Sequence, residues 1–305
     1  MDGYGQKRQD RFSTIFHRIP LSLQLGISLL VLLAALLHAS WNALLKSDSD
    51  RVAGMAAILL TGGVIGIVLT PLVPFPEPAG LAYLLASAVV HHIYYFTLIK
   101  AYRHGDLSHV YPIARGLGPF IVAIASGPVL GESLAAGQIG GVVLVSCGLA
   151  SLAFHGKSSP ARPGDSRANM YAILTGILIA AYTVLDALGV RSSPDPFSYI
   201  VWLNVLEAPF VPLFAIWLRG RALIPYVRQH GLRAMAGGMM GTLGYGIVVW
   251  AYAMGTVAQA ATLRETSVIF AALIGTMILG EPFGRYRVLA AALVAAGVIL
   301  LHAAA

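Results

Sequence analysis

The chain has 305 residues, of which 57% are hydrophobic and only 11% are charged. Soluble globular proteins carry about 25% charged residues, so this composition could not build a water-exposed surface. It excludes a soluble globular protein and predicts one that lives in a lipid bilayer. The net charge of +7 does not indicate nucleic-acid binding, because the basic residues lie between apolar runs, where they normally set membrane topology.

Apolar runs of about 20 residues, the length of a helix that crosses a bilayer, follow one another along the chain. They occupy residues 22–45, 52–73, 79–102, 107–129, 133–154, 169–190, 197–218, 233–254, 257–279 and 285–303. A membrane barrel would show short alternating strands instead. Because backbone groups in lipid must be satisfied within the segment, these runs are helices. The predicted fold is an all-α membrane protein with ten transmembrane helices.

Polar segments divide the chain. Residues 1–21 form a basic N-terminal tail without the small-residue cleavage site of a signal peptide. Residues 156–168, rich in Pro, Gly and Ser, form a linker between a first five-helix unit at 22–155 and a second at 169–305. Cys147 is the only cysteine, which excludes an intrachain disulfide.

The second half repeats the first. Residues 101–149 resemble residues 251–298, with an offset of 150 at Ala101 and Ala251 that becomes 149 at Gly131 and Gly280. An odd number of helices per repeat gives the two repeats opposite orientations, related by a pseudo-two-fold axis in the membrane plane. Inverted duplication of this kind is typical of secondary transporters. The absolute orientation stays open, because the loops and the basic tail favour opposite directions.

The first helix carries three polar residues on one stripe, since His38, Asn42 and Lys46 are spaced by four. Polar side chains inside membrane helices face a cavity or bond a neighbouring helix. We expect His38 and Asn42, with Trp41 beside them, to line a solute-binding cavity; hydrogen bonding between helices is the alternative. We expect Lys46 to reach the membrane interface.

The third helix contains two adjacent pairs, His91 with His92 and Tyr94 with Tyr95. Neighbouring residues on a helix point about 100° apart, so one member of each pair should face inward and the other a neighbouring helix. His91 and Tyr95, spaced by four, are the predicted binding residues. No spacing typical of a metal site is present, so we expect no metal and no cofactor.

Arg115 and Glu265 are related by the repeat offset and lie at similar depths in their helices. Opposite charges near a pseudo-two-fold axis either neutralise each other or bind the two ends of a zwitterion. Arg264 could also pair with Glu265 or face the cavity. Tyr111 precedes Arg115 by one turn and is included in the predicted site.

Arg115 lies among residues that bend helices, namely Pro112, Gly116, Gly118 and Pro119. This helix should therefore kink and free carbonyl groups near the midplane, either for function or for packing alone. The equivalent helix of the second half has Thr262, Thr266, Val268 and Ile269 at the matching positions. We expect that helix to be straighter.

Three further residues complete the predicted binding site: Tyr182 and Asp186, spaced by four in the sixth helix, and Tyr245, between two glycines in the eighth. Other candidates are Asn204 and Glu207, whereas Trp202 and Trp250 are more typical of interfacial belts. Buried carboxylates can carry protons. We predict Glu265 and His91 as the proton-coupling residues.

The chain contains the motifs HASWNALLK at 38–46, AYRHGD at 101–106, YPIARG at 111–116, RETSVIFAALIG at 264–275, and LGE at 130–132 and 279–281. Together they resemble the motifs of the drug/metabolite transporter superfamily, EamA-like branch. HASWNALLK with RETSV is also similar to a subgroup associated with phosphonate use. The resemblance implies a solute carrier with two five-helix halves around a central cavity, often an exporter of amino acids or other small metabolites.

These observations predict a secondary transporter of a small polar or zwitterionic metabolite in the bacterial inner membrane, with no catalytic residues. The chain lacks a Walker-type motif for ATP. The solute would lie between the first, third, fourth, sixth, eighth and ninth helices and move by alternating access. An intramembrane enzyme is the alternative function. The partners are the solute and the bilayer, and both a monomer and a homodimer fit the sequence.

Overall fold

The computed structural model describes residues 21–46, 48, 50–104, 107–155, 166–277 and 285–303. Every regular element in these ranges is a helix, which confirms the all-α prediction. The first half contains α2 (Leu21–Lys46), α3 (Arg51–Leu69), the 3₁₀ turn η1 (Thr70–Leu72), α4 (Pro78–His104), α5 (Leu107–Ser126) and α6 (Ala136–His155). The second contains α7 (Ser166–Ser192), α8 (Pro196–Glu207), α9 (Phe210–Arg219), η2 (Gly220–Ala222), α10 (Leu223–Met254), α11 (Val257–Arg264), α12 (Ser267–Met277) and α13 (Arg285–Ala303).

The helices form one bundle whose exposed surface is apolar. Within the described ranges, six helical stretches are long and apolar enough to cross a membrane, and three further apolar helices are shorter. Each predicted run coincides with one helix or two consecutive helices, but the number of ten crossings stays a prediction. Large apolar side chains such as Val68 and Ile299 point outward, whereas Ala35, Ala101 and Ala251 are buried. Small residues inside and large apolar residues outside are typical of membrane bundles.

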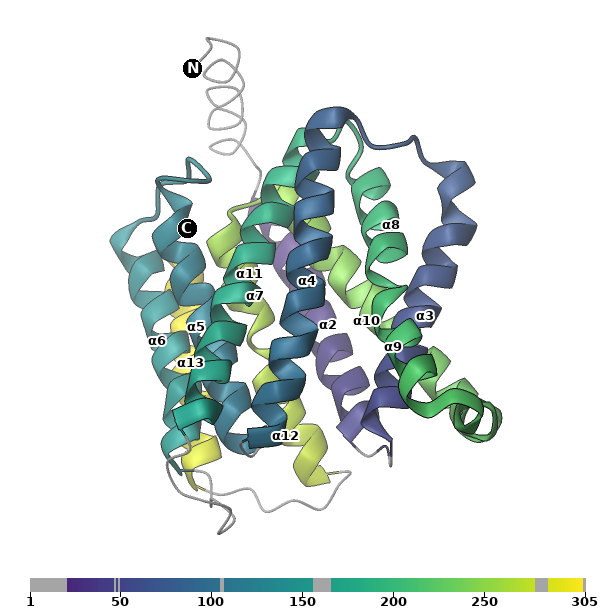
Figure 1. Cartoon of the computed structure of the whole chain (residues 1–305). Coiled ribbons are helices and arrows are strands. Elements are labelled where there is room, and N and C mark those ends of the chain that lie inside the picture. Colours follow the sequence, from purple (N-terminus) through teal and green to yellow (C-terminus); the bar gives the residue numbers. More distant parts are fainter. Residues whose placement is uncertain are drawn as a thin grey trace.

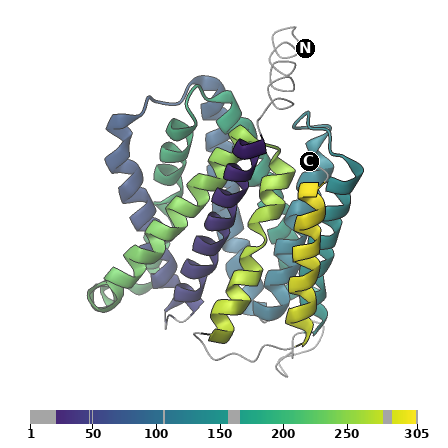
Figure 2. The same ribbon diagram turned by 180° about the vertical axis from the view of Figure 1, so that it is seen from behind.

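The packing follows the inverted repeat. α4, in the third predicted run of the first half, packs along α7, in the first run of the second half. In the same way α10, in the third run of the second half, packs along α2, in the first run of the first half. α5, α6 and α13 lie on one side of the bundle and α3, α8 and α9 on the other (Figure 1). Figure 2 shows that α2 begins at the same end of the bundle at which α13 finishes.

The crossing of α6 and α13 shows the pseudo-symmetry residue by residue. Gly297 lies against the backbone of Gly141, and Gly148 lies against the backbone of Ala290. Each residue of the first contact is related to one of the second by the 149-residue offset, Gly148 to Gly297 and Gly141 to Ala290. A two-fold relation between the halves requires this exchange of partners.

The helix break lies in the half opposite to the one predicted. α5 is a continuous helix with Pro112 and Pro119 inside it, whereas the helix expected to be straighter stops at Arg264 and resumes at Ser267 as α12. The Thr262 hydroxyl donates to the carbonyl of Ala258, and the Thr266 hydroxyl to that of Leu263. The backbone tightens there to i−3 hydrogen bonds. Threonine hydroxyls that compete for backbone carbonyls therefore break this helix, and the prediction was wrong.

Two other boundaries differ from the prediction. The run at 197–218 is divided into α8 and α9 next to Pro209, which has no backbone N–H to donate. α10 begins ten residues before the predicted start and projects beyond the bundle (Figure 2). The tail at 1–20, most of the linker, the second LGE motif and the side chain of Lys46 lie outside the part that the structure describes.

Candidate functional site

A cavity of about 150 Å³ lies between the two halves. Its wall comes from α2, α3, α4 and α5 of the first half and from α7, α8, α10 and α11 of the second. The structure brings all but two of the predicted binding residues to this wall, namely His38, Trp41, Asn42, His91, Tyr95, Tyr111, Arg115, Tyr182 and Tyr245. Asp186 and Glu265 lie behind it. α3 and α8 were not among the helices expected to contact the solute.

The α2 stripe lies on the cavity wall because helical periodicity puts it on one face. The His38 ring contacts Trp41 edge to face, with 5.1 Å between ring centroids. Asn42 Nδ2 donates to the carbonyl of His38 at 2.8 Å, so this amide group bonds within its own helix.

Aromatic rings form another part of the wall. His91 stacks on Tyr182 with centroids 3.9 Å apart, which joins α4 to α7. His92 points away and packs on Phe210, as expected for the second member of the pair. Tyr94 and Tyr95, however, both line the cavity. The expectation that only one of them faces inward was wrong, because the cavity is wide enough to contact adjacent faces of α4.

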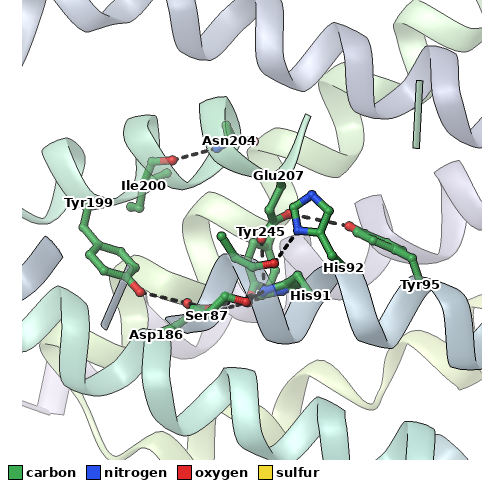
Figure 3. Close-up of polar contacts among 11 residues, drawn as sticks. Ser87, His91, His92, Tyr95, Asp186, Tyr199, Ile200, Asn204, Glu207 and Tyr245 are labelled. Carbon is green, nitrogen blue, oxygen red and sulfur yellow. Dashed lines mark hydrogen bonds and ion pairs between the residues drawn. The ribbon is translucent and has the colours of Figure 1, made fainter. Parts of the chain in front are cut away.

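Asp186 on α7 is fully buried and accepts three hydroxyl hydrogen bonds. The donors are Tyr199, at 2.9 Å, and the hydroxyl groups of Ser87 and Tyr245 (Figure 3). A carboxylate with this many donors is well compensated for its loss of water. Asp186 thus supports the wall through Tyr245 and does not itself line the cavity.

Glu207 on α8 lines the cavity and has weaker partners. Its Oε1 lies 3.2 Å from His91 Nδ1, and Tyr95 donates to its Oε2 over a long 3.5 Å (Figure 3). The His91 contact is close enough for an ion pair but lacks the alignment of a hydrogen bond, so Oε1 has no hydrogen-bond donor among the described residues. Glu207 was a further candidate from the sequence but was not among the predicted binding residues. The sequence signal that could have identified Glu207 as a site residue is its position, since it is a carboxylate midway along an apolar run.

The opposite charge comes from two arginines that share one carboxylate. Arg115 Nε lies 2.8 Å from Glu265 Oε2, and Arg264 Nε lies 3.6 Å from Oε1. Arg115 also faces the Tyr111 ring at 5.8 Å and approaches Ser267 at 3.4 Å. The two contacts with Glu265 are ion pairs rather than aligned hydrogen bonds, whereas Arg115 Nη2 donates a hydrogen bond to Ser267 Oγ. Both arginines line the cavity while Glu265 is fully buried behind them, so this part of the wall has an excess of one positive charge.

The first LGE motif lies at the end of the bundle near the start of α2. Glu132 pairs with Arg191 at 2.5 Å and accepts the backbone N–H of Val257 at 2.9 Å. Arg191 also donates to the carbonyls of Tyr252 and Gly255. A carboxylate at the N-terminus of α11 and a cation at the C-terminus of α10 match the helix dipoles. These contacts tie the first half to the second.

The described residues contain no group of three His, Cys, Asp or Glu side chains that could hold a metal ion. The cavity chemistry therefore rests on two arginines, one cavity-facing carboxylate, histidines and tyrosines. This combination suits a small solute with separate anionic and cationic groups.

The model of the EamA-like transporter family matches this chain over residues 25–154 and 166–303. A solved structure titled "Crystal structure of protein" has a TM-score of 0.74 at 17% sequence identity, and the match covers 92% of this chain and 99% of the other. That likeness shows the fold alone. No curated protein matches the chain. Since the family model matches nearly all of the apolar part, the chain belongs to the EamA-like transporter family.

Proposed function

We propose that this protein is a secondary active exporter of a small zwitterionic metabolite, such as an amino acid or an aminophosphonate, in a bacterial inner membrane. The observation that supports this most directly is the cavity between the two inverted halves, with Arg115 and Arg264 on its wall and Glu207 on another part of that wall. The arginines would bind the carboxylate or phosphonate, and Glu207 would face the ammonium group. Tyr182 and Trp41 would contact the apolar part of the solute.

The cavity size limits the solute. A cavity of about 150 Å³ accommodates a molecule roughly as large as benzene. Small amino acids and aminophosphonates fall in this range, whereas nucleotides and lipids exceed it. The size and the charge pattern together favour a compact zwitterion.

Alternating access would follow from rocking of one half against the other around the cavity. The Glu132 and Arg191 contacts would close one end in the conformation described here, because they join the halves at that end. They would separate when this end opens. The two halves form the whole cavity in one chain, so a monomer is the proposed working unit.

Thermal unfolding of the detergent-purified protein with a panel of solutes tests this function. The panel contains amino acids, aminophosphonates, polyamines, nucleosides and sugar phosphates. A solute at about 100 times its Kd stabilises the protein by about 2.7 kcal/mol, which raises the unfolding temperature measurably. We expect this shift with zwitterions, and uptake of the same solutes by proteoliposomes.

Variants locate the binding site. Removing Arg115 alone would leave Glu265 with a single partner, so the double variant Arg115→Gln with Glu265→Gln is the better test. It should reduce the shift, because Arg264 alone then remains to bind the anionic group. Arg228→Gln changes an exposed arginine on α10 and should leave the shift intact. A shift with polyamines alone, or one that the double variant retains at full size, would contradict the zwitterion assignment.

A further inference from the structure

The buried carboxylates near the cavity differ in how their charge is compensated. Glu265 lies between the guanidinium groups of Arg115 and Arg264, so its charge is balanced by two cations. Asp186 accepts three hydroxyl hydrogen bonds. Neither carboxylate lines the cavity. To bind to Glu265 a proton would have to compete with two guanidinium groups, and to bind to Asp186 it would have to compete with three hydroxyl donors.

Glu207 is the carboxylate that faces the cavity, and its charge is the least compensated. Only 11% of its side chain is exposed, and its Oε1 accepts no aligned hydrogen bond from the described residues. No arginine or lysine of the described chain pairs with it; its ion-pair partner is His91. A buried carboxylate without a cation neutralises by binding a proton.

The contacts of His91 show which of its two nitrogens carries a hydrogen and which can take a second proton. Nδ1 lies 3.0 Å from the carbonyl oxygen of Ser87, which can only accept, so Nδ1 carries a hydrogen. This N–H is also 3.2 Å from Glu207 Oε1. Nε2 lies 3.4 Å from the hydroxyl oxygen of Tyr245, whose own hydrogen is donated to Asp186. Nε2 therefore faces an acceptor, and a second proton on His91 would have a partner there.

We propose that the coupling proton of this transporter binds to the pair formed by His91 and Glu207. One proton makes the pair neutral overall, either as carboxylic acid beside imidazole or as carboxylate beside imidazolium. This inference rests on the proposed transport function. It replaces Glu265, the residue that the sequence favoured, with a carboxylate that lines the cavity.

The neighbouring ionisable groups are compatible with this role. The groups around the pair are His92 and Tyr95 from α4, Tyr182 and Asp186 from α7, Tyr245 from α10 and Arg264 from α11. α3 packs against this region through Gly63, where a methyl group would lie 2.2 Å from Ala208 Cβ. Asp186 disfavours a second negative charge close by, and Arg264 is already shared with Glu265.

Infrared titration of the carboxyl groups tests the pair without any solute. Purified protein is titrated from about pH 5 to about pH 9, and the carboxylic C=O absorption is compared with that of variants. We expect a titrating carboxyl signal that is assigned to Glu207 because Asp186→Asn and Glu77→Gln, a matched change at an exposed acid, both retain it. Glu207→Gln should remove the signal, and His91→Gln should shift its midpoint. A signal that survives in Glu207→Gln, or that disappears in Glu265→Gln instead, overturns the proposal.

Proteoliposomes then connect the proton to transport. With the panel amino acids, Glu207→Gln should weaken exchange of labelled for unlabelled solute, because it removes the group proposed to face the ammonium, and the transport that remains should not respond to a pH gradient. Accumulation by Glu207→Gln at the wild-type level overturns the coupling role. If the wild type moves none of the amino acids while the infrared signal behaves as expected, the proposed function fails and the proton site stands.

Discussion

Gly297→Ala is predicted to destabilise the protein, although alanine normally stabilises a helix relative to glycine. Gly297 lies where α13 crosses α6. A methyl group there would lie 2.7 Å from the carbonyl oxygen of Gly141, 2.8 Å from Val145 Cγ2 and 3.0 Å from Val145 N. Two of these neighbours are backbone atoms, which cannot rotate away as the end of a side chain can. The two helices must separate to admit the methyl group.

The size of the effect follows from these distances. Ordinary contact begins at 3.4 Å, so the crossing must open by about 0.7 Å, and overpacking of this kind costs about 1–3 kcal/mol. The gain from replacing a helical glycine by alanine is about 0.5–1 kcal/mol. We therefore expect a net loss of up to about 2.5 kcal/mol in the free energy of unfolding.

The assay is unfolding of the purified protein in mixed micelles, with the same substitution at other helical glycines as controls. Gly26→Ala in α2 meets no atom within 4 Å and should stabilise. Gly148→Ala meets Leu293 Cβ at 2.9 Å and the Ala290 carbonyl at 3.2 Å. It should cause a smaller loss than Gly297→Ala. If Gly297→Ala proves as stable as Gly26→Ala, the close crossing of α6 and α13 is wrong.

Two further predictions concern the ends of the bundle. Glu132→Gln should lower the free energy of unfolding by about 1–3 kcal/mol, because Arg191 loses its buried partner, whereas Glu77→Gln should not. Asp50 caps α3 and pairs with Arg219. Partial burial raises the pKa of the Asp50 carboxyl. The backbone hydrogen bond from Ala53 and the Arg219 guanidinium outweigh this effect and hold the pKa below its ordinary value. Asp50→Ala should therefore cost about 1 kcal/mol at neutral pH. This difference should shrink as the pH falls from about 4, the ordinary carboxyl pKa, through the lower pKa of the folded state. Unfolding curves at several pH values measure both effects, and a difference for Asp50→Ala that grows on acidification would contradict the second.

Composition and periodicity were sufficient to predict the helices and much of the cavity wall. Each apolar run is helical because the backbone has no other way to satisfy its hydrogen bonds in lipid. The four-residue spacing of His38 and Asn42 places both on one helix face, and the cavity lies on that face. The repeat offset likewise predicted that Arg115 and Glu265 would lie at related depths, and the structure places them 2.8 Å apart.

Periodicity could not predict which helix breaks. Pro112 and Pro119 are strong local signals for a bend, yet α5 stays helical through both. The interruption instead lies at Glu265 and Thr266, where two threonine hydroxyls bond backbone carbonyls and Glu265 joins two arginines. These are weak signals in a sequence, and the ion pairs depend on helices that are far apart along the chain.

The pairing of His91 with Glu207 also depends on tertiary packing, since the residues lie on α4 and α8. This pairing helps to explain how the protein tolerates several buried charged side chains within a membrane. Arg115 and Arg264 with Glu265 leave one positive charge, and Asp186 with Glu207 add two negative charges. One proton on the His91 and Glu207 pair then makes the empty cavity region neutral, the state that a low-dielectric interior favours. A solute that carries one positive and one negative group would preserve this balance, whereas an unpaired anion or cation would disturb it.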